Sequence, residues 1–286
     1  MRSPGGMLWS MVELLAPAPA GVRLLSLHAT SDLQRADRLL RRTWGTQPGD
    51  DAPLALDMMC ALAHTGGYVG GAFLDDELVG VAAGFLAAGG TLHSHIAGVA
   101  REAQGRGVGL ALKRHQRAWA AERGLTAITW TFDPLVRRNA YFNLTRLGAT
   151  AVEYLPDFYG PLSDGINDGD VSDRLFVTWP VAAPPPGAAS PPGADAGAVA
   201  AKTADGLTAA VPILDEAGAV HEAGGAPSLR CATPPDVERL REDDPGAARH
   251  WRAALGAALG GALADGYLIT GFTRSGWYLL ARGGAA

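Results

Sequence analysis

Two histidines separated by one residue precede a glycine-rich segment in this sequence. His93 and His95 lie in an alternating apolar stretch, residues 91–99, which predicts a β-strand with both side chains on one face of the sheet. Imidazole titrates near pH ~6.5, so a histidine can take a proton from an ammonium group at neutral pH. The pair is therefore a candidate general base. The alternative, a partly buried histidine bonded to neighbouring backbone, stays open for each.

The segment that follows the strand can bind an anion. It consists of Gln104, Gly105, Arg106, Gly107, Val108 and Gly109, and Leu110 begins a helical pattern. A glycine-rich turn that opens a helix exposes backbone N–H groups at the positive end of the helix dipole, as a pyrophosphate requires. The alternative is a turn that only enters a helix. A Walker loop would need Gly-Lys-Ser/Thr, and a dinucleotide fold would need a parallel sheet with a ribose-binding acid; neither pattern is present.

The elements that must position these residues follow from apolar periodicity. The predicted order from residue 22 to 179 is β-α-α-β-β-β-α-β-α-β-β. Predicted strands cover residues 22–27, 68–74, 77–86, 91–99, 127–132, 149–154 and 175–179, and predicted helices cover residues 31–44, 54–63, 110–123 and 137–147. Asp75-Asp76 and Gly89-Gly90 predict hairpin turns, so three consecutive strands should be antiparallel.

Composition divides the 286 residues into four parts. We expect an N-terminal extension (1–20), a main α/β domain (21–181), an Ala/Gly/Pro-rich linker (182–226) and a small α+β domain (227–286). In the last part, Asp244-Pro245 predicts the start of a long helix that carries Trp251, Leu255, Leu259 and Leu263 on one face.

Bulk properties limit the partners. The net charge is -5 and the arginines are scattered, which argues against nucleic acid. No apolar run reaches the length of a membrane span. Cys60 and Cys231 are far apart, which predicts neither a disulfide framework nor a metal site and favours the cytoplasm.

The loop resembles the acetyl-CoA signature of the GNAT superfamily, Gln/Arg-x-x-Gly-x-Gly/Ala, through Gln104, Gly107 and Gly109. The resemblance implies an α/β fold with a mixed, mostly antiparallel sheet flanked by helices. It also implies an acyl-CoA N-acyltransferase that uses acetyl-CoA or another acyl-CoA and a small-molecule amine acceptor. The loop from Gln104 to Leu110 would hold the pyrophosphate, and main-chain groups near Val99 would pair with the pantetheine arm.

The His-x-His-x-x-x-Val pattern before the loop resembles arylalkylamine N-acetyltransferases, in which the two matching histidines relay the proton of the substrate amine. The resemblance assigns that role to His93 and His95. It does not extend to the rest of the chain, so the acceptor does not follow from it.

Many superfamily members carry a tyrosine that protonates the departing CoA thiolate, and this sequence has Leu144 at that position. Tyr141, Tyr159 or solvent could replace it. Asn139 and Asn143 are four residues apart on one predicted helix face, where either could bond the cofactor arm; the alternative for one of them is a solvated surface position.

Several segments resemble a group of bacterial predicted acetyltransferases of this superfamily. The resemblance includes the C-terminal module. These segments are TWTFDPL, RNAYFNLTRLG, YLPDFYG and SDRLFVTW. Trp130 and Asp133 end the strand beside which the acceptor would approach, and Asp133 could bind a cationic amine. The alternative for Asp133 is an Asx-turn before Pro134.

Two other function classes stay open. One is a non-catalytic acyl-CoA-binding module, suggested by the missing thiolate acid. The other keeps the fold and cofactor but performs O-acylation or decarboxylation of an acyl-CoA. The C-terminal module could be a lid, an element of acceptor specificity or a contact of a homodimer.

Overall fold

The structure is a computed structural model that describes residues 19–46, 50, 52–160, 171–182 and 209–283. The described residues form two compact units. Unit 1 comprises residues 19–130 and 180–182, and unit 2 comprises residues 131–160, 171–179 and 209–283. The boundary falls inside strand β5 (Ala127–Phe132), so one strand contributes to both units.

The sheet of unit 1 is mixed and mostly antiparallel. Its strands are β1 (Val22–Ser26), β2 (Tyr68–Leu74), β3 (Glu77–Ala87), β4 (Thr91–Val99) and the start of β5, in that order. Neighbours among β1 to β4 are antiparallel, whereas β5 runs parallel to β4. Asp75 and Asp76 have φ angles of 48° and 64° between β2 and β3, and Gly89 and Gly90 turn the chain into β4. Both predicted hairpins are present.

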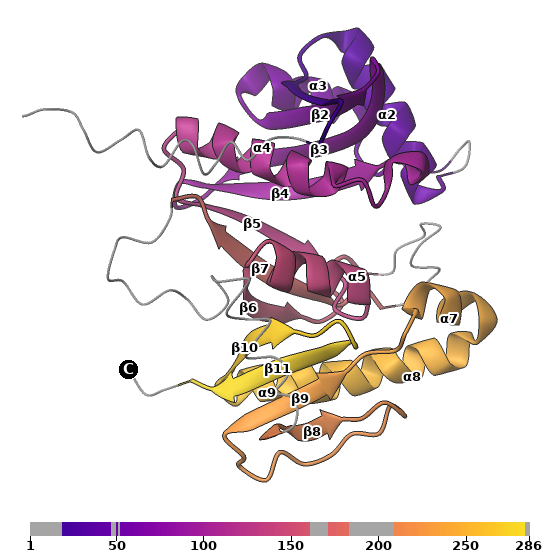
Figure 1. Cartoon of the computed structure of the whole chain (residues 1–286), viewed down its shortest axis with the longest axis vertical. Helices are drawn as coiled ribbons and strands as arrows, with labels where there is room; N and C mark the ends of the chain where they lie inside the picture. Colours follow the sequence, from indigo (N-terminus) through magenta and orange to yellow (C-terminus); the bar gives the residue numbers. More distant parts are fainter. Residues whose placement is uncertain (1–18, 47–49, 51, 161–170, 183–208, 284–286) are drawn as a thin grey trace, which may run out of the picture. The chain divides into compact units, whose positions relative to one another are not determined.

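Helices cover both faces of this sheet (Figure 1). They are α2 (Thr30–Trp44), α3 (Leu56–Thr65), a 3-10 turn η1 (Arg101–Ala103) and α4 (Val108–Glu122). A Cβ at Gly98 would meet Trp44 of α2, whereas a Cβ at Gly80 would meet Leu112 of α4. Gly80 lies opposite Val99 in the ladder, so the two helices pack on opposite faces. The order predicted from periodicity is confirmed in this unit.

The first helix of unit 2 combines an α-helical and a π-helical segment. The sequence predicts one helix over residues 137–147; the structure has α5 (Arg137–Ala140) followed by a π-helical segment η2 (Tyr141–Arg146). Strands β6 (Thr150–Leu155) and β7 (Arg174–Pro180) then pair antiparallel.

The C-terminal part forms a second sheet in the order β10-β11-β9-β8. Its strands are β8 (Val211–Leu214), β9 (Ser228–Ala232), β10 (Tyr267–Phe272) and β11 (Trp277–Arg282). This sheet and the preceding elements share one compact unit, since β10 contacts β6 and η2. Thr145 donates a hydrogen bond to the carbonyl of Phe272 (2.7 Å), and Tyr278 donates one to the carbonyl of Pro134 (2.7 Å).

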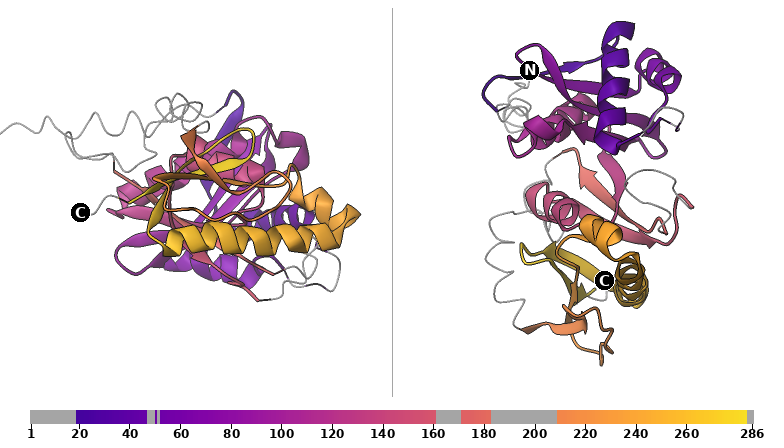
Figure 2. Two further views of the ribbon diagram at one scale, coloured as in Figure 1. Left: turned by 90° about the horizontal axis from the view of Figure 1, so that it is seen from below. Right: turned by 90° about the vertical axis from the view of Figure 1, so that its right-hand side faces the viewer.

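The remaining helices run α7 (Val237–Asp243), α8 (Pro245–Leu255), π-helical η3 (Gly256–Gly260) and α9 (Gly261–Ala264). The last three follow one another along a single rod (Figure 2). The Asp244 side chain accepts a hydrogen bond from Ala247 N, which confirms the predicted start of α8. The π-helical turn shifts the phase of the buried face, so Ala262 is buried where the sequence predicts Leu263.

The C-terminal part has the second, small sheet, but its first strand β8 lies within the predicted linker, and this part belongs to the same compact unit as residues 131–160 and 171–179. Most of the predicted N-terminal extension (residues 1–18) and of the predicted linker (residues 183–208) lies outside the described residues. None of the helices in the part of the chain that the structure describes combines the length and apolarity needed to cross a membrane.

Candidate active site

Strand β4 carries a β-bulge at the histidine pair. Ile96 lies opposite Ala83 of β3 and Ser94 lies opposite Gly84, so His95 has no partner in the ladder. The alternation that predicted a shared face is interrupted here, because a bulge inserts one extra residue into the period of two.

Gly84 is the residue that allows β4 to approach β3 at the bulge. A Cβ at this position would lie 2.6 Å from the carbonyl oxygen of His93 and 3.2 Å from the Cα of Ser94. Both atoms belong to the backbone and cannot rotate away. Glycine at position 84 therefore sets the path of the strand that carries the histidines.

The bulge nevertheless leaves both histidine rings beside one aromatic side chain. The ring of Phe85 lies 5.1 Å from that of His93 and 6.0 Å from that of His95, between centroids. His93 Nδ1 lies 3.2 Å from the hydroxyl of Thr129 on β5. The structure thus brings the two predicted base candidates together.

Both histidines have lowered pKa values. Burial lowers the pKa of His93, and the neighbouring His95 and Lys113 lower it further. Burial also lowers the pKa of His95. A lowered pKa means that the imidazole is neutral at pH 7 and can accept a proton.

Strand β4 extends beyond its pairing with β5. Residues 91–93 pair with residues 127–129 in a parallel ladder. Among the described strands, none pairs with residues 94–99 on that side. The pairing ends at His93, so the backbone that continues to Val99 can pair with an extended ligand. At the far end, the side-chain amide of Gln104 donates to the carbonyl of Val99 (3.3 Å).

The glycine loop forms an uncapped helix N-terminus. Gly105 and Gly107 have φ angles of 74° and 80°, and Gly107, the N-cap of α4, makes no side-chain cap hydrogen bond. Gly105, Arg106 and Gly107 are exposed, whereas Val108 is buried and anchors the helix start. First-turn N–H groups lack helical acceptors, and the exposed Arg106 adds positive charge beside them. This arrangement suits an anion such as a pyrophosphate.

Trp130 lies in the interior of unit 1. It is buried, and the Lys113 ammonium lies 4.0 Å from the centre of its indole. The sequence places Trp130 at the acceptor; in the structure its ring is instead covered by a lysine of α4. Lys113 itself was missed by sequence reasoning. Its signal is the spacing of residues 113, 116 and 120, the i, i+3, i+7 pattern of a buried helix face.

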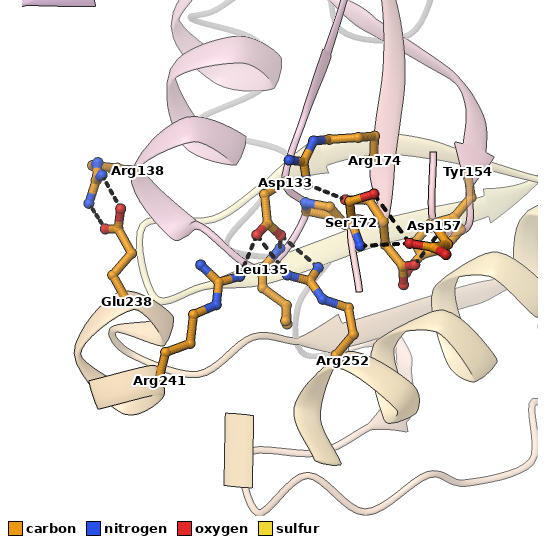
Figure 3. Close-up of polar contacts among 12 residues, drawn as sticks. Asp133, Leu135, Arg138, Tyr154, Asp157, Ser172, Arg174, Glu238, Arg241 and Arg252 are labelled. Carbon is orange, nitrogen blue, oxygen red and sulfur yellow. Dashed lines mark hydrogen bonds and ion pairs between the residues drawn. The ribbon is translucent and has the colours of Figure 1, made fainter. Parts of the chain in front are cut away.

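Asp133 is the centre of a buried ion-pair cluster in unit 2 (Figure 3). Its carboxylate accepts from Arg241 (2.6 Å) and from both terminal nitrogens of Arg252 (2.8 and 2.7 Å). Burial alone would raise the pKa of Asp133, but the hydrogen bonds and charges of Arg252 and Arg241 outweigh it and lower the pKa to about 2.

These contacts correct the prediction that Asp133 binds a cationic amine. Both of its carboxylate oxygens are used by guanidinium groups of the same chain. One oxygen also accepts from the backbone N–H of Leu135 (2.9 Å), which is the Asx-turn that the sequence offers as the alternative.

The two tyrosines predicted as thiolate acids also lie in unit 2. The hydroxyl of Tyr141 accepts a hydrogen bond from Arg274 Nε (3.0 Å). The hydroxyl of Tyr159 lies 3.2 Å from that of Thr131, and its ring is partly exposed with the Arg174 guanidinium 5.3 Å away.

The two asparagines differ in burial. Asn139 is half-buried on α5, whereas Asn143 is buried in η2. The π-helical segment changes the i, i+4 geometry on which their common face was predicted. Leu144 is buried in the core.

Part of the chain matches one known protein family. Residues 27–148 match the family described as "Acetyltransferase (GNAT) family". The matched segment includes the histidine strand, the glycine loop and α4. No curated protein matches the sequence.

Solved structures that match this chain share little sequence with it. The ribosomal-protein-S18-alanine N-acetyltransferase from Escherichia coli is 15% identical with a TM-score of 0.46, covering 59% of this chain and 99% of its own. The yncA protein from Salmonella typhimurium, determined with its cofactor acetyl-CoA, is 15% identical with a TM-score of 0.47, covering 60% and 98%. An N-acetyltransferase from Staphylococcus aureus Mu50 is 12% identical with a TM-score of 0.47, covering 57% and 99%.

Proposed function

We propose that this chain, whose residues 27–148 match the GNAT acetyltransferase family, acetylates a small-molecule amine with His93 and His95 as general base or proton relay. Acyl transfer from acetyl-CoA belongs to the family. The amine acceptor and the role of the histidines are our proposal.

The described residues fit acyl-CoA. The uncapped first turn of α4, with Gly105 and Gly107 in the left-handed region, can hold the pyrophosphate through backbone N–H groups. The backbone of β4 between His93 and Val99 can pair with the amides of the pantetheine arm, because β5 does not pair with it there. When bound, acyl-CoA supplies an activated thioester.

The histidine pair prepares the acceptor for attack. A primary amine is mostly protonated at neutral pH, and a neutral imidazole can take that proton. Acyl transfer then forms a bond between the amine nitrogen and the acyl carbon and breaks the carbon–sulfur bond. The proton released by the attacking nitrogen balances the charge on the leaving sulfur. Solvent can deliver that proton, and Tyr141 and Tyr159 stay candidates from the sequence alone.

The observation that carries the proposal is where the ladder between β4 and β5 ends. The last pair is His93 with Thr129, so the base candidates stand at the start of the unpaired backbone of β4. A thioester held along that backbone would have its acyl end beside the histidines.

Both cysteines are free thiols, which supports the reducing cytoplasm as the compartment.

Cofactor binding is tested by calorimetric titration of the full chain with acetyl-CoA and longer acyl-CoAs. In Gly107→Trp we expect binding to be lost. Gly66→Trp is the control, since Gly66 also has a positive φ (88°) but lies at the end of α3, where an added Cβ meets nothing within 4 Å. Loss of binding in both variants, or in neither, would contradict the loop as the cofactor site.

Catalysis is tested with a panel of amines, measuring thiol release and product mass. We expect His93→Ala and His95→Ala to lower turnover by about 10²–10⁴-fold while acetyl-CoA still binds. His64→Ala, an exposed histidine on α3, is the control. An ester product, or loss of carbon dioxide from an acyl-CoA, would favour the other chemistries of the fold; binding without any product would favour a non-catalytic module.

A further inference from the structure

Lys113 is a lysine in the interior of unit 1. Its side chain extends from α4, is 6% exposed, and donates a hydrogen bond to the hydroxyl of Ser94 (2.8 Å). Within the described residues no carboxylate pairs with it; its other neighbour is the indole face of Trp130. A buried ammonium without a counter-charge is costly, and burial lowers the pKa of Lys113 to about 7.

The partner of Lys113 stands between the two histidines. Ser94 is the residue between His93 and His95 in β4, and it is the last residue paired with β3 before the bulge. The hydrogen bond therefore joins α4, the helix that begins at the glycine loop, to the strand at the point where the base candidates project. The bond links helix α4 to the strand segment between the two histidines.

Two charged groups lower the pKa of His93 in addition to burial, namely His95 on its own strand and Lys113 on α4. Strand β3 carries one charged residue, Glu77 at its start, and β5 carries none. On α4, His115 is bonded to the hydroxyl of Tyr68 on β2. On α2, the half-buried charges pair with each other, Arg41 with Asp37 and Arg35 with Asp32, while Arg38 and Arg42 are exposed. Lys113 is thus the cation on a packed element that acts on His93.

We propose that Lys113 is a positioning residue for the reaction: it holds Ser94 at the bulge, and its positive charge disfavours protonation of His93. This inference rests on the proposed function, in which the histidines act as base. The charge and the hydrogen bond have separate consequences. The charge sets the pH at which His93 becomes available, and the bond sets the orientation of the strand.

The electrostatic part has a definite sign. His93 takes up its proton below its ordinary value of 6.5, and Lys113, with a pKa of about 7, is largely charged in that range. Removing the positive charge must therefore raise the pKa of His93. The acid limb of the activity profile moves to higher pH by the same amount.

The test uses three variants of the full chain. Lys113→Gln removes the charge and keeps a donor for Ser94; Lys113→Met removes both; Ser94→Ala removes the acceptor and keeps the charge. Arg114→Met, a half-buried neighbour on α4, is the matched control for loss of a cation. The primary measurement is the pKa of His93 from NMR titration of labelled histidine, which needs no acceptor.

We expect both Lys113 variants to raise the pKa of His93 and the acid limb of kcat/KM by roughly half a pH unit or more, as for a unit charge at an effective dielectric constant of about 20. Ser94→Ala should lower kcat several-fold without moving the limb. Acetyl-CoA affinity should stay within about twofold in all variants.

An unchanged His93 pKa in folded Lys113→Gln or Lys113→Met would overturn the inference. A shift of the same size in Arg114→Met would also overturn it, because the effect would then be non-specific. Full turnover in His93→Ala, together with a raised His93 pKa in the Lys113 variants, would contradict the proposed role of His93 as base. It would leave the effect of Lys113 on His93 supported.

Discussion

Unit 1 and unit 2 each bury a charged side chain, and they stabilise it in opposite ways. Lys113 in unit 1 is 6% exposed and Asp133 in unit 2 is 8% exposed. Lys113 has a hydroxyl and an indole as neighbours, whereas Asp133 has two guanidinium groups and a backbone N–H. The pKa of the lysine is lowered to about 7 and that of the aspartate to about 2.

The difference separates a titratable site from a structural one. The lysine pKa moves toward neutral pH, so Lys113 exchanges its proton in the range in which the histidines work. The aspartate pKa moves away from neutral pH, so Asp133 stays ionised and its contacts stay fixed. Since Asp133 follows β5 while Arg241 and Arg252 lie on α7 and α8, the cluster ties the C-terminal part to the rest of unit 2.

The largest expected effect comes from removing the centre of the paired cluster. Asp133→Ala leaves Arg241 and Arg252 buried without their shared counter-charge. We expect the free energy of unfolding to fall by roughly 3–5 kcal/mol, the usual result of removing one partner of a buried ion pair. Chemical denaturation of the full chain at pH 7 measures it.

Asp265→Ala, at an exposed position after α9, is the control and should change stability by less than about 0.5 kcal/mol. A loss below about 1 kcal/mol in Asp133→Ala would mean that the two arginines find other partners. The C-terminal helices would then not depend on this cluster.

Replacing the buried Lys113 should increase the free energy of unfolding, whereas replacing Asp133 should decrease it. The unfolded chain takes up the Lys113 proton as pH falls below about 10.5, whereas the folded chain does so only near 7. Falling pH therefore favours the unfolded state across that window. Lys113→Met removes this effect, so we expect it to be more stable than the native chain at pH 6, by roughly 3 kcal/mol after relaxation around the site.

Denaturation at several pH values checks the prediction. The advantage of Lys113→Met should shrink as pH rises towards 10, while Arg114→Met should show no such trend. A variant that is less stable than the native chain at pH 6 would show that the ammonium is stabilised where it lies, and the contrast with Asp133 would fail.

Backbone geometry at the bulge gives a third, smaller effect. A methyl group at position 84 would press on the His93 carbonyl and on Ser94, so Gly84→Ala should move β4 and weaken the bond to Lys113. We expect a loss of about 1–3 kcal/mol, typical of overpacking, together with a further lowered pKa of Lys113, because the bond to Ser94 favours the charged lysine. Gly261→Ala on α9, where a Cβ meets nothing within 4 Å, is the control. Equal stability of both variants would contradict a tight approach of the strands.

Local signals in the sequence were sufficient for much of the fold. The glycine loop, the Asp75-Asp76 hairpin and the Asp244 cap each depend on a few adjacent residues, and each lies where it was predicted. The bulge at His95 was not predicted, because an alternating pattern does not reveal an extra residue that only the pairing with β3 defines.

The buried charges show the limit of sequence reasoning more directly. Asp133 was predicted to bind substrate because its partners were unknown; Arg241 and Arg252 are 108 and 119 residues away. Lys113 escaped notice because lysine is rarely buried, although its spacing on α4 is that of a core position. Long-range pairing, not residue type, decides which charged groups are available for chemistry.

An exposed ion pair in unit 2 should contribute much less to stability than the buried Asp133 cluster. Arg138 on α5 and Glu238 on α7 form a two-pronged ion pair, one bond of which is 2.6 Å, with the arginine 69% exposed. The chemistry is that of Asp133 with Arg252, but water screens it. A double-mutant cycle with Arg138→Ala and Glu238→Ala should therefore give a coupling of only about 0.2–1 kcal/mol, falling as salt is added. A coupling as large as that between Asp133 and Arg252 would show that geometry, rather than burial, determines the strength of these pairs.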